Sequence, residues 1–119
     1  MPAPRPGKPV RGSTTGRPIM AALDLFGRRW ALRILWELRS GPLGARALLA
    51  RCEGMSSSVL YQRLRELASS GIIAPSADGY ELTRLGTALG HALRPLDEWA
   101  AIWAQEQEHH DQEPEGRSP

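Results

Sequence analysis

One stretch of the chain carries hydrogen-bonding side chains at helical spacing. Between residues 56 and 70, the leucines Leu60, Leu64 and Leu67 repeat as one face of a helix. The opposite face then presents Ser58, Tyr61, Gln62, Arg65 and Ser69. Glutamine can bridge adenine and arginine can bridge guanine through paired hydrogen bonds in the major groove of DNA. We therefore expect Gln62 and Arg65 to contact bases. The alternative is an ordinary solvated helix face, which more usually carries glutamate and lysine.

The start of the same helix offers groups that suit a phosphate. Ser56, Ser57 and Ser58 supply an N-cap, and the free N–H groups at a helix start attract anions. Arg29, Arg46 and Arg63 are expected either to contact phosphates or to act as salt-bridge partners, and the sequence leaves both open.

Other residues that could do chemistry lack a supporting context. The run Glu108-His109-His110-Asp111 resembles a metal cluster, but it lies in a Pro/Glu segment without fixed geometry. No Gly-rich phosphate loop, paired catalytic carboxylates or nucleophile motif is present. We therefore expect no enzyme activity, no cofactor and no metal site. Cys52 shares an apolar helical face with Leu48 and Leu49, which indicates a small buried hydrophobe.

The composition is that of a soluble globular protein with one domain. The chain has 119 residues, 41% of them hydrophobic and 24% charged. A single cysteine excludes an internal disulfide and fits a reducing compartment. No apolar run approaches the ~18 residues of a membrane-spanning helix, and no secretory signal is visible. A cytoplasmic location without membrane contact is expected.

Charge divides the chain into a basic and an acidic half. Residues 28–65 hold eight arginines against two glutamates, and residues 1–17 add Arg5, Lys8, Arg11 and Arg17 without an acid. Residues 66–115 hold ten acids against two arginines. A basic region suits nucleic acid only if a reading element lies within it.

The elements that must position these residues follow one another in a definite order. Helices are predicted at 18–26, 28–39, 44–51 and 56–70, with Gly27 ending the first and Gly71 the last. Strands at 72–75 and 80–82 flank Asp78-Gly79, which predicts a type I′ turn. A long helix over 84–106 follows, capped by Thr83, and Pro95 should kink or split it.

This order predicts a mainly α fold with a small two-stranded β wing, a winged helix-turn-helix. The domain is expected over 18–106, after a flexible basic arm at 1–17 and before an acidic disordered tail at 107–119. The long helix has a heptad-like apolar seam that exceeds what one small domain needs to cover. The seam includes Leu89, Leu96, Trp99 and Trp103 and indicates a partner chain.

Several ordered segments resemble HxlR-type winged helix-turn-helix transcriptional regulators. They are residues 22–30, 34–38 with Gly41-Pro42, 60–67 with Gly71-Ile72-Ile73, 80–86, and Glu98-Trp99. The resemblance covers about residues 18–104 and implies a DNA-binding homodimer whose first and last helices form the interface. The implied interface residues are Ile19, Leu23, Phe26, Leu89, Leu96, Trp99 and Trp103.

Two features depart from that family. Members often carry a sensing cysteine before the proline that opens the first helix, whereas this chain has Arg17 before Pro18, so thiol sensing is excluded there. The wing is also short, and residues 72–82 contain Asp78 and Glu81 but no lysine or arginine. The basic arm is a candidate to replace the wing's minor-groove contact.

The sequence thus predicts a homodimeric regulator, a repressor, that binds double-stranded DNA at a near-palindromic operator. Trp30 and Trp36 could meet Trp99 and Trp103 in a pocket for a small aromatic effector, although packing alone would also explain these four tryptophans. The alternative function is a winged-helix interaction module without specific DNA binding.

Overall fold

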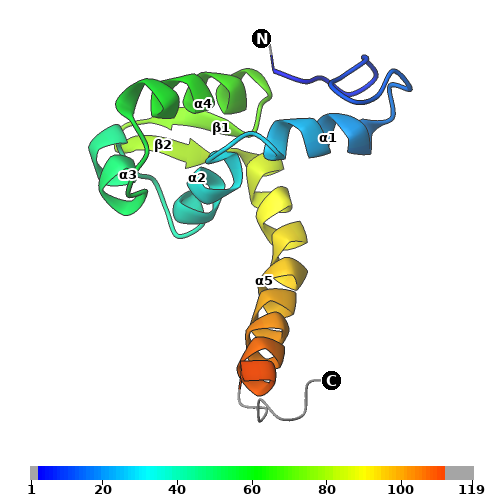
Figure 1. Ribbon diagram of the computed structural model, residues 1–119. Coiled ribbons are helices and arrows are strands. Elements are labelled where there is room, and N and C mark those ends of the chain that lie inside the picture. Colours follow the sequence, from blue (N-terminus) through cyan, green and yellow to red (C-terminus); the bar gives the residue numbers. More distant parts are fainter. Residues whose placement is uncertain (1–2, 112–119) are drawn as a thin grey trace.

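The computed structural model describes residues 3–111, and their fold is a winged helix-turn-helix, as predicted (Figure 1). The elements of the described part are α1 Pro18–Phe26, α2 Ala31–Leu38, α3 Ala45–Arg51, α4 Ser57–Ser69, β1 Ile73–Ser76, β2 Gly79–Leu82 and α5 Arg84–Asp111. No helix among these residues is long and apolar enough to cross a membrane.

The core forms around α2, because this helix is apolar on several sides. It contacts α1, α3, α5 and β2, and Ile34, Leu35 and Leu38 are buried. Leucines of α3 and α4 close the core from the other side, as their spacing predicted. Cys52 is fully buried in this cluster, which confirms its structural role. Burial raises the pKa of its thiol above the usual value of 9.0.

The helix expected from residue 28 begins only at Ala31. Residues 28–30 form a turn in which the N–H of Ala31 donates to the carbonyl of Arg28 at 3.1 Å. Trp30 has φ 77°, in the left-handed region, where a right-handed helix cannot continue. Its ring packs against the core, which indicates why the backbone accepts this conformation.

The ends of α4 confirm the predicted capping residues. The Oγ of Ser56 accepts the N–H of Val59 at 3.2 Å. At the other end Gly71 has φ 78°, and the N–H of Ile72 donates to the carbonyl of Leu67 at 3.0 Å. This is a Schellman motif, in which a glycine allows the left-handed turn that ends the helix.

The wing pairs β1 with β2 in the register Ile73↔Leu82 to Ser76↔Gly79. The prediction of a type I′ turn at Asp78-Gly79 is wrong. The turn residues are Ala77 and Asp78, and neither has the positive φ that a type I′ turn requires. The wing is attached to the body by two hydrogen bonds between Leu43 and Tyr80, at 3.0 and 2.9 Å.

The long helix α5 is neither split at Pro95 nor finished at residue 106. It is continuous from Arg84 to Asp111. Proline has no N–H, so the helix lacks one backbone hydrogen bond at Pro95. The turns before and after Pro95 nevertheless stay helical. Residues 107–111 are helical rather than part of a disordered tail, because glutamine and glutamate favour helix. The rest of the expected tail lies outside the described residues. Thr83 caps the start, its Oγ1 accepting the N–H of Gly86 at 3.1 Å.

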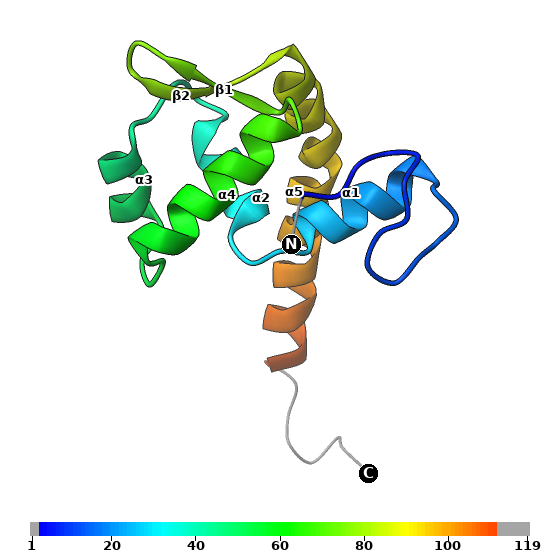
Figure 2. The ribbon, with the colours of Figure 1, turned by 90° about the horizontal axis from the view of Figure 1, so that it is seen from above.

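Residues 3–17 fold back beside α1 (Figure 2). The N–H of Gly7 donates to the carbonyl of Gly16 at 3.0 Å, and Pro4 is buried. The expected flexibility of this arm stays a prediction.

Candidate nucleic-acid interface

The outer face of α4 is open to solvent over its whole length. Leu60, Leu64 and Leu67 are buried and hold the helix on the core. The side chains expected to read DNA all lie exposed on the other side, namely Ser58, Tyr61, Gln62, Arg65 and Ser69. In Figure 1, α4 lies at the end of the molecule opposite the C-terminal end of α5. The structure therefore presents hydrogen-bonding groups on one exposed and firmly supported helix.

The start of α4 brings together the serines that are expected to bind a phosphate. Ser56, Ser57 and Ser58 are exposed, and the Oγ atoms of Ser56 and Ser58 lie 3.2 Å apart. Arg46 is exposed on α3, which packs against α4. This end of the helix combines N–H groups and hydroxyls, a combination that suits a phosphate.

Arg63 differs from the other expected DNA contacts because its guanidinium is used inside the protein. Its Nε donates to the carbonyl of Arg29 at 2.7 Å. Its Nη1 pairs with Glu66 Oε1 at 3.0 Å, and the side chain is only 15% exposed. Of the two roles left open by the sequence, the salt bridge is therefore the one this geometry provides.

Glu66 was missed as a functional residue by the sequence reasoning. It is the one charged residue found buried in the described part of the chain. Its second carboxylate oxygen pairs with Arg28 in the turn after α1, and Arg28 also pairs with Asp24 of α1 at 3.7 Å. The carboxylate therefore connects α4 with α1 and the turn. In the sequence, the position of Glu66 next to Leu67, at the border of the apolar face of the helix, could have indicated that this glutamate is buried.

The wing offers no cation to a DNA backbone. Asp78 and Glu81 are exposed, and the residues of the hairpin include no lysine or arginine. The structure thus agrees with the sequence, in which the short wing departs from the HxlR-type pattern and carries acidic residues without basic ones.

The expected dimer residues fall into two groups. Ile19, Leu23, Leu96, Trp99 and Trp103 are 50–60% exposed although they are large and apolar. Phe26 and Leu89 instead pack partly against the core of their own chain. Leu85 and Ile102 are also more than half exposed on α5. The rings of Trp99 and Trp103 stack with centroids 5.5 Å apart.

The four tryptophans do not form one group within the chain. Trp30 packs on the core. Trp36 faces α5, where it lines a cavity with His91 and Arg94, whereas Trp99 and Trp103 lie further along α5. A meeting of the two pairs across an interface stays a prediction.

Fold and exposed helix together define a winged helix-turn-helix regulator of transcription. Residues 25–108 match the model of the HxlR-like helix-turn-helix family. The chain belongs to this family.

Known proteins similar to this chain are also described as transcriptional regulators. An uncharacterized HTH-type transcriptional regulator of Bacillus subtilis, YvaP, is 30% identical over 89 residues, which cover 69% of this chain and 82% of that protein. The crystal structure of quinone-bound YodB from B. subtilis superposes with a TM-score of 0.66 at 30% identity, over 71% of this chain and 96% of that one. A MarR-family regulator from Enterococcus faecalis gives 0.68 at 27% identity, over 84% and 97%.

Proposed function

We propose that the protein is a homodimeric, sequence-specific repressor that binds a near-palindromic operator. The observation that carries this proposal is the exposed row of Tyr61, Gln62 and Arg65 on a helix whose other face is buried. In a two-fold dimer, two copies of α4 would enter successive major grooves about one helical turn apart. Repression follows because a dimer on its operator excludes other proteins from that DNA.

The residues have separate roles in this proposal. Gln62 and Arg65 contact base edges, with Ser57, Ser58 and Tyr61 beside them. Ser56 and Arg46 contact phosphates. Arg63 acts on DNA through its effect on α4, because its guanidinium is bound to Glu66 and to the Arg29 carbonyl.

The dimer forms through the exposed apolar residues of α1 and α5. Burial of apolar surface stabilises association by about 25 cal/mol per Å². Leu23, at 60% exposure, and Trp99, at 54%, are large side chains that water would otherwise cover. An isologous contact would place both α4 helices on the same side of the dimer.

The basic arm supplies the contact that the acidic wing lacks. Arg5 and Lys8 are exposed, and arms of this kind enter the minor groove in other DNA-binding proteins. Deletion of residues 2–16 should weaken DNA binding, and an unchanged affinity would refute this role.

An aromatic effector completes the proposal. The relative YodB was solved with bound quinone. In this chain Arg17 precedes Pro18 and the sole cysteine is buried. An effector would therefore bind without forming a bond to a surface thiol.

Selection of bound duplexes from a random pool at about 150 mM salt tests the proposal. We expect enrichment of an inverted repeat with half-sites ~10 bp apart. Weak binding without an enriched motif would reject the regulator in favour of an interaction module, and a protein partner would then be sought.

A further inference from the structure

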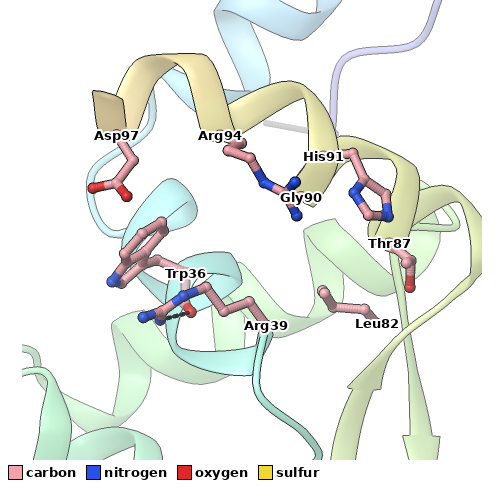
Figure 3. A pocket seen from close by; sticks show the side chains of 8 residues that line it. All are labelled: Trp36, Arg39, Leu82, Thr87, Gly90, His91, Arg94 and Asp97. Carbon is pink, nitrogen blue, oxygen red and sulfur yellow. Dashed lines mark hydrogen bonds between the residues drawn. The ribbon is translucent and has the colours of Figure 1, made fainter. Parts of the chain in front are cut away.

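A cavity of about 290 Å³ lies between α2, β2 and the first half of α5 (Figure 3). In Figure 3, the side chains of His91 and Arg94 extend from α5 toward those of Arg39 and Leu82 on the opposite wall. The volume lies just below the range for ligand pockets, about 300–1,000 Å³. It suits a molecule with a single ring.

The polar side of this cavity is cationic. Arg94 has no salt-bridge partner among residues 3–111, where ion pairs of Arg28, Arg33, Arg51 and Arg63 are found. Figure 3 shows its guanidinium directed into the cavity between Gly90 and His91, with the Thr87 side chain on the same wall. Asp97, the carboxylate of the lining, lies at the other end beside Trp36. Asp97 disfavours an anion at its end, so an anion is favoured at the Arg94 end of the cavity.

The other side of the cavity offers an aromatic ring, which is flanked by a second arginine. Arg39 lies over the indole of Trp36 at 3.6 Å and donates to the Trp36 carbonyl at 2.8 Å, which fixes the ring as a wall. Next to it, a hollow of about 260 Å³ is lined mostly by apolar residues, with two charged ones at its border: Trp36, Leu32, Leu93, Leu96 and Ala100, with Arg33 and Asp97. The two spaces share Trp36 and Asp97. A ligand with a flat apolar body and one anionic group matches this combination.

We propose that this cavity binds a small aromatic carboxylate. The carboxylate accepts hydrogen bonds from Arg94 with His91 and Thr87 nearby, and the ring lies against Trp36 and Leu82. Charge-assisted hydrogen bonds from a guanidinium to a carboxylate supply the orientation. The proposal deepens the effector part of the proposed function and rests on it for its regulatory meaning.

The location gives such a ligand a means to act. Trp36 and Leu82 belong to the body that holds α4, whereas Arg94 belongs to the helix that carries the exposed apolar residues Leu96, Trp99 and Trp103. A ligand that contacts both sides sets their relative orientation, and with it the spacing of two α4 helices in a dimer.

Calorimetric titration of the full chain without DNA tests the site, with benzoate, its neutral analogue benzamide and inorganic phosphate as probes. Two variants change the cavity. Arg94→Gln removes the cation. Gly90→Leu fills the space, since a Cβ at Gly90 meets nothing within 4 Å and leucine favours helix more than glycine. Arg84→Gln, at the exposed start of α5, is the matched control.

We expect benzoate to bind, at least about tenfold more tightly than benzamide, and inorganic phosphate to bind more weakly than benzoate. Arg94→Gln and Gly90→Leu should each weaken benzoate at least about tenfold, and Arg84→Gln should leave it unchanged. Absence of benzoate binding at millimolar concentration, or equal binding by all three variants, would overturn the site. Because DNA is absent, failure here is distinct from failure of the operator selection.

Discussion

The body formed by α2, α3, α4 and the wing buries most of its large apolar side chains within the single chain, whereas α1 and α5 leave several of theirs exposed. In the body, Leu60 and Leu67 are fully buried, and the buried charge of Glu66 has two arginine partners. On α1 and α5, Leu23 and Trp103 are more than half exposed. The difference indicates that the body folds by its own contacts, while the second surface keeps large apolar side chains exposed, as the proposed dimer requires.

The largest effect should come from opening the charged contact inside the body. Glu66→Ala removes the carboxylate that Arg28 and Arg63, at 10% and 15% side-chain exposure, share. We expect a loss of about 3–5 kcal/mol in the free energy of unfolding, because the arginines keep their desolvation penalty. Urea denaturation measures this loss. The exposed control Glu53→Ala should change the free energy of unfolding by at most about 0.5 kcal/mol. A similarly small change for Glu66→Ala would contradict the stabilising role of the Glu66 ion pairs.

The next effect concerns the open surface. Trp99→Ser and Trp103→Ser should each weaken dimer association by about 2 kcal/mol or more, since buried tryptophans dominate interfaces. Light scattering during size exclusion measures the dimer, and circular dichroism checks that the body stays folded. Gln105→Ser alters the same helix at an exposed polar position and serves as control. Variants that remain dimeric at all concentrations would remove these rings from the interface.

A smaller effect is expected on the outer face of α4. Arg65→Ala should cost about 1–3 kcal/mol of operator binding and relax specificity at one base pair, because the bidentate contact to guanine is lost. Arg46→Ala should instead weaken all sequences alike and lower the salt slope by about 1. Competition binding with operator and random DNA separates the two. Equal losses on both DNAs for Arg65→Ala would refute its role in reading bases.

The smallest effect is expected at Cys52. The thiol is fully buried and its pKa is raised by burial, so little thiolate is present near neutral pH. A disulfide reagent should label the native protein far more slowly than the protein in urea. Above the usual thiol pKa of 9.0, stability should fall with pH, because the folded state holds the proton more tightly. Rapid labelling of the native protein would mean that the core opens readily.

Prediction from sequence was best where a local pattern has one physical meaning. The leucine spacing in 60–67, the cap at Ser56 and the turn at Gly71 all lie where expected. Prediction was wrong where a distant contact overrides a local preference. Because Trp30 takes a left-handed backbone conformation, α2 begins at Ala31 and not at residue 28. The wing turn also differs from the expected type, and it lies beside the pairing of Leu43 with Tyr80.

The sequence alone determined which faces are apolar, where most helices begin and end, and which side chains lie outside on α4, because helix periodicity assigns these locally. Only the tertiary structure decided that Arg63 turns inward to Glu66, that Phe26 and Leu89 serve their own core, and that Arg94 and Trp36 share a cavity. Those outcomes depend on residues far apart in the chain, and the Arg28–Glu66 contact spans 38 positions. No local pattern encodes such a distance, because the partners meet only after the helices have packed.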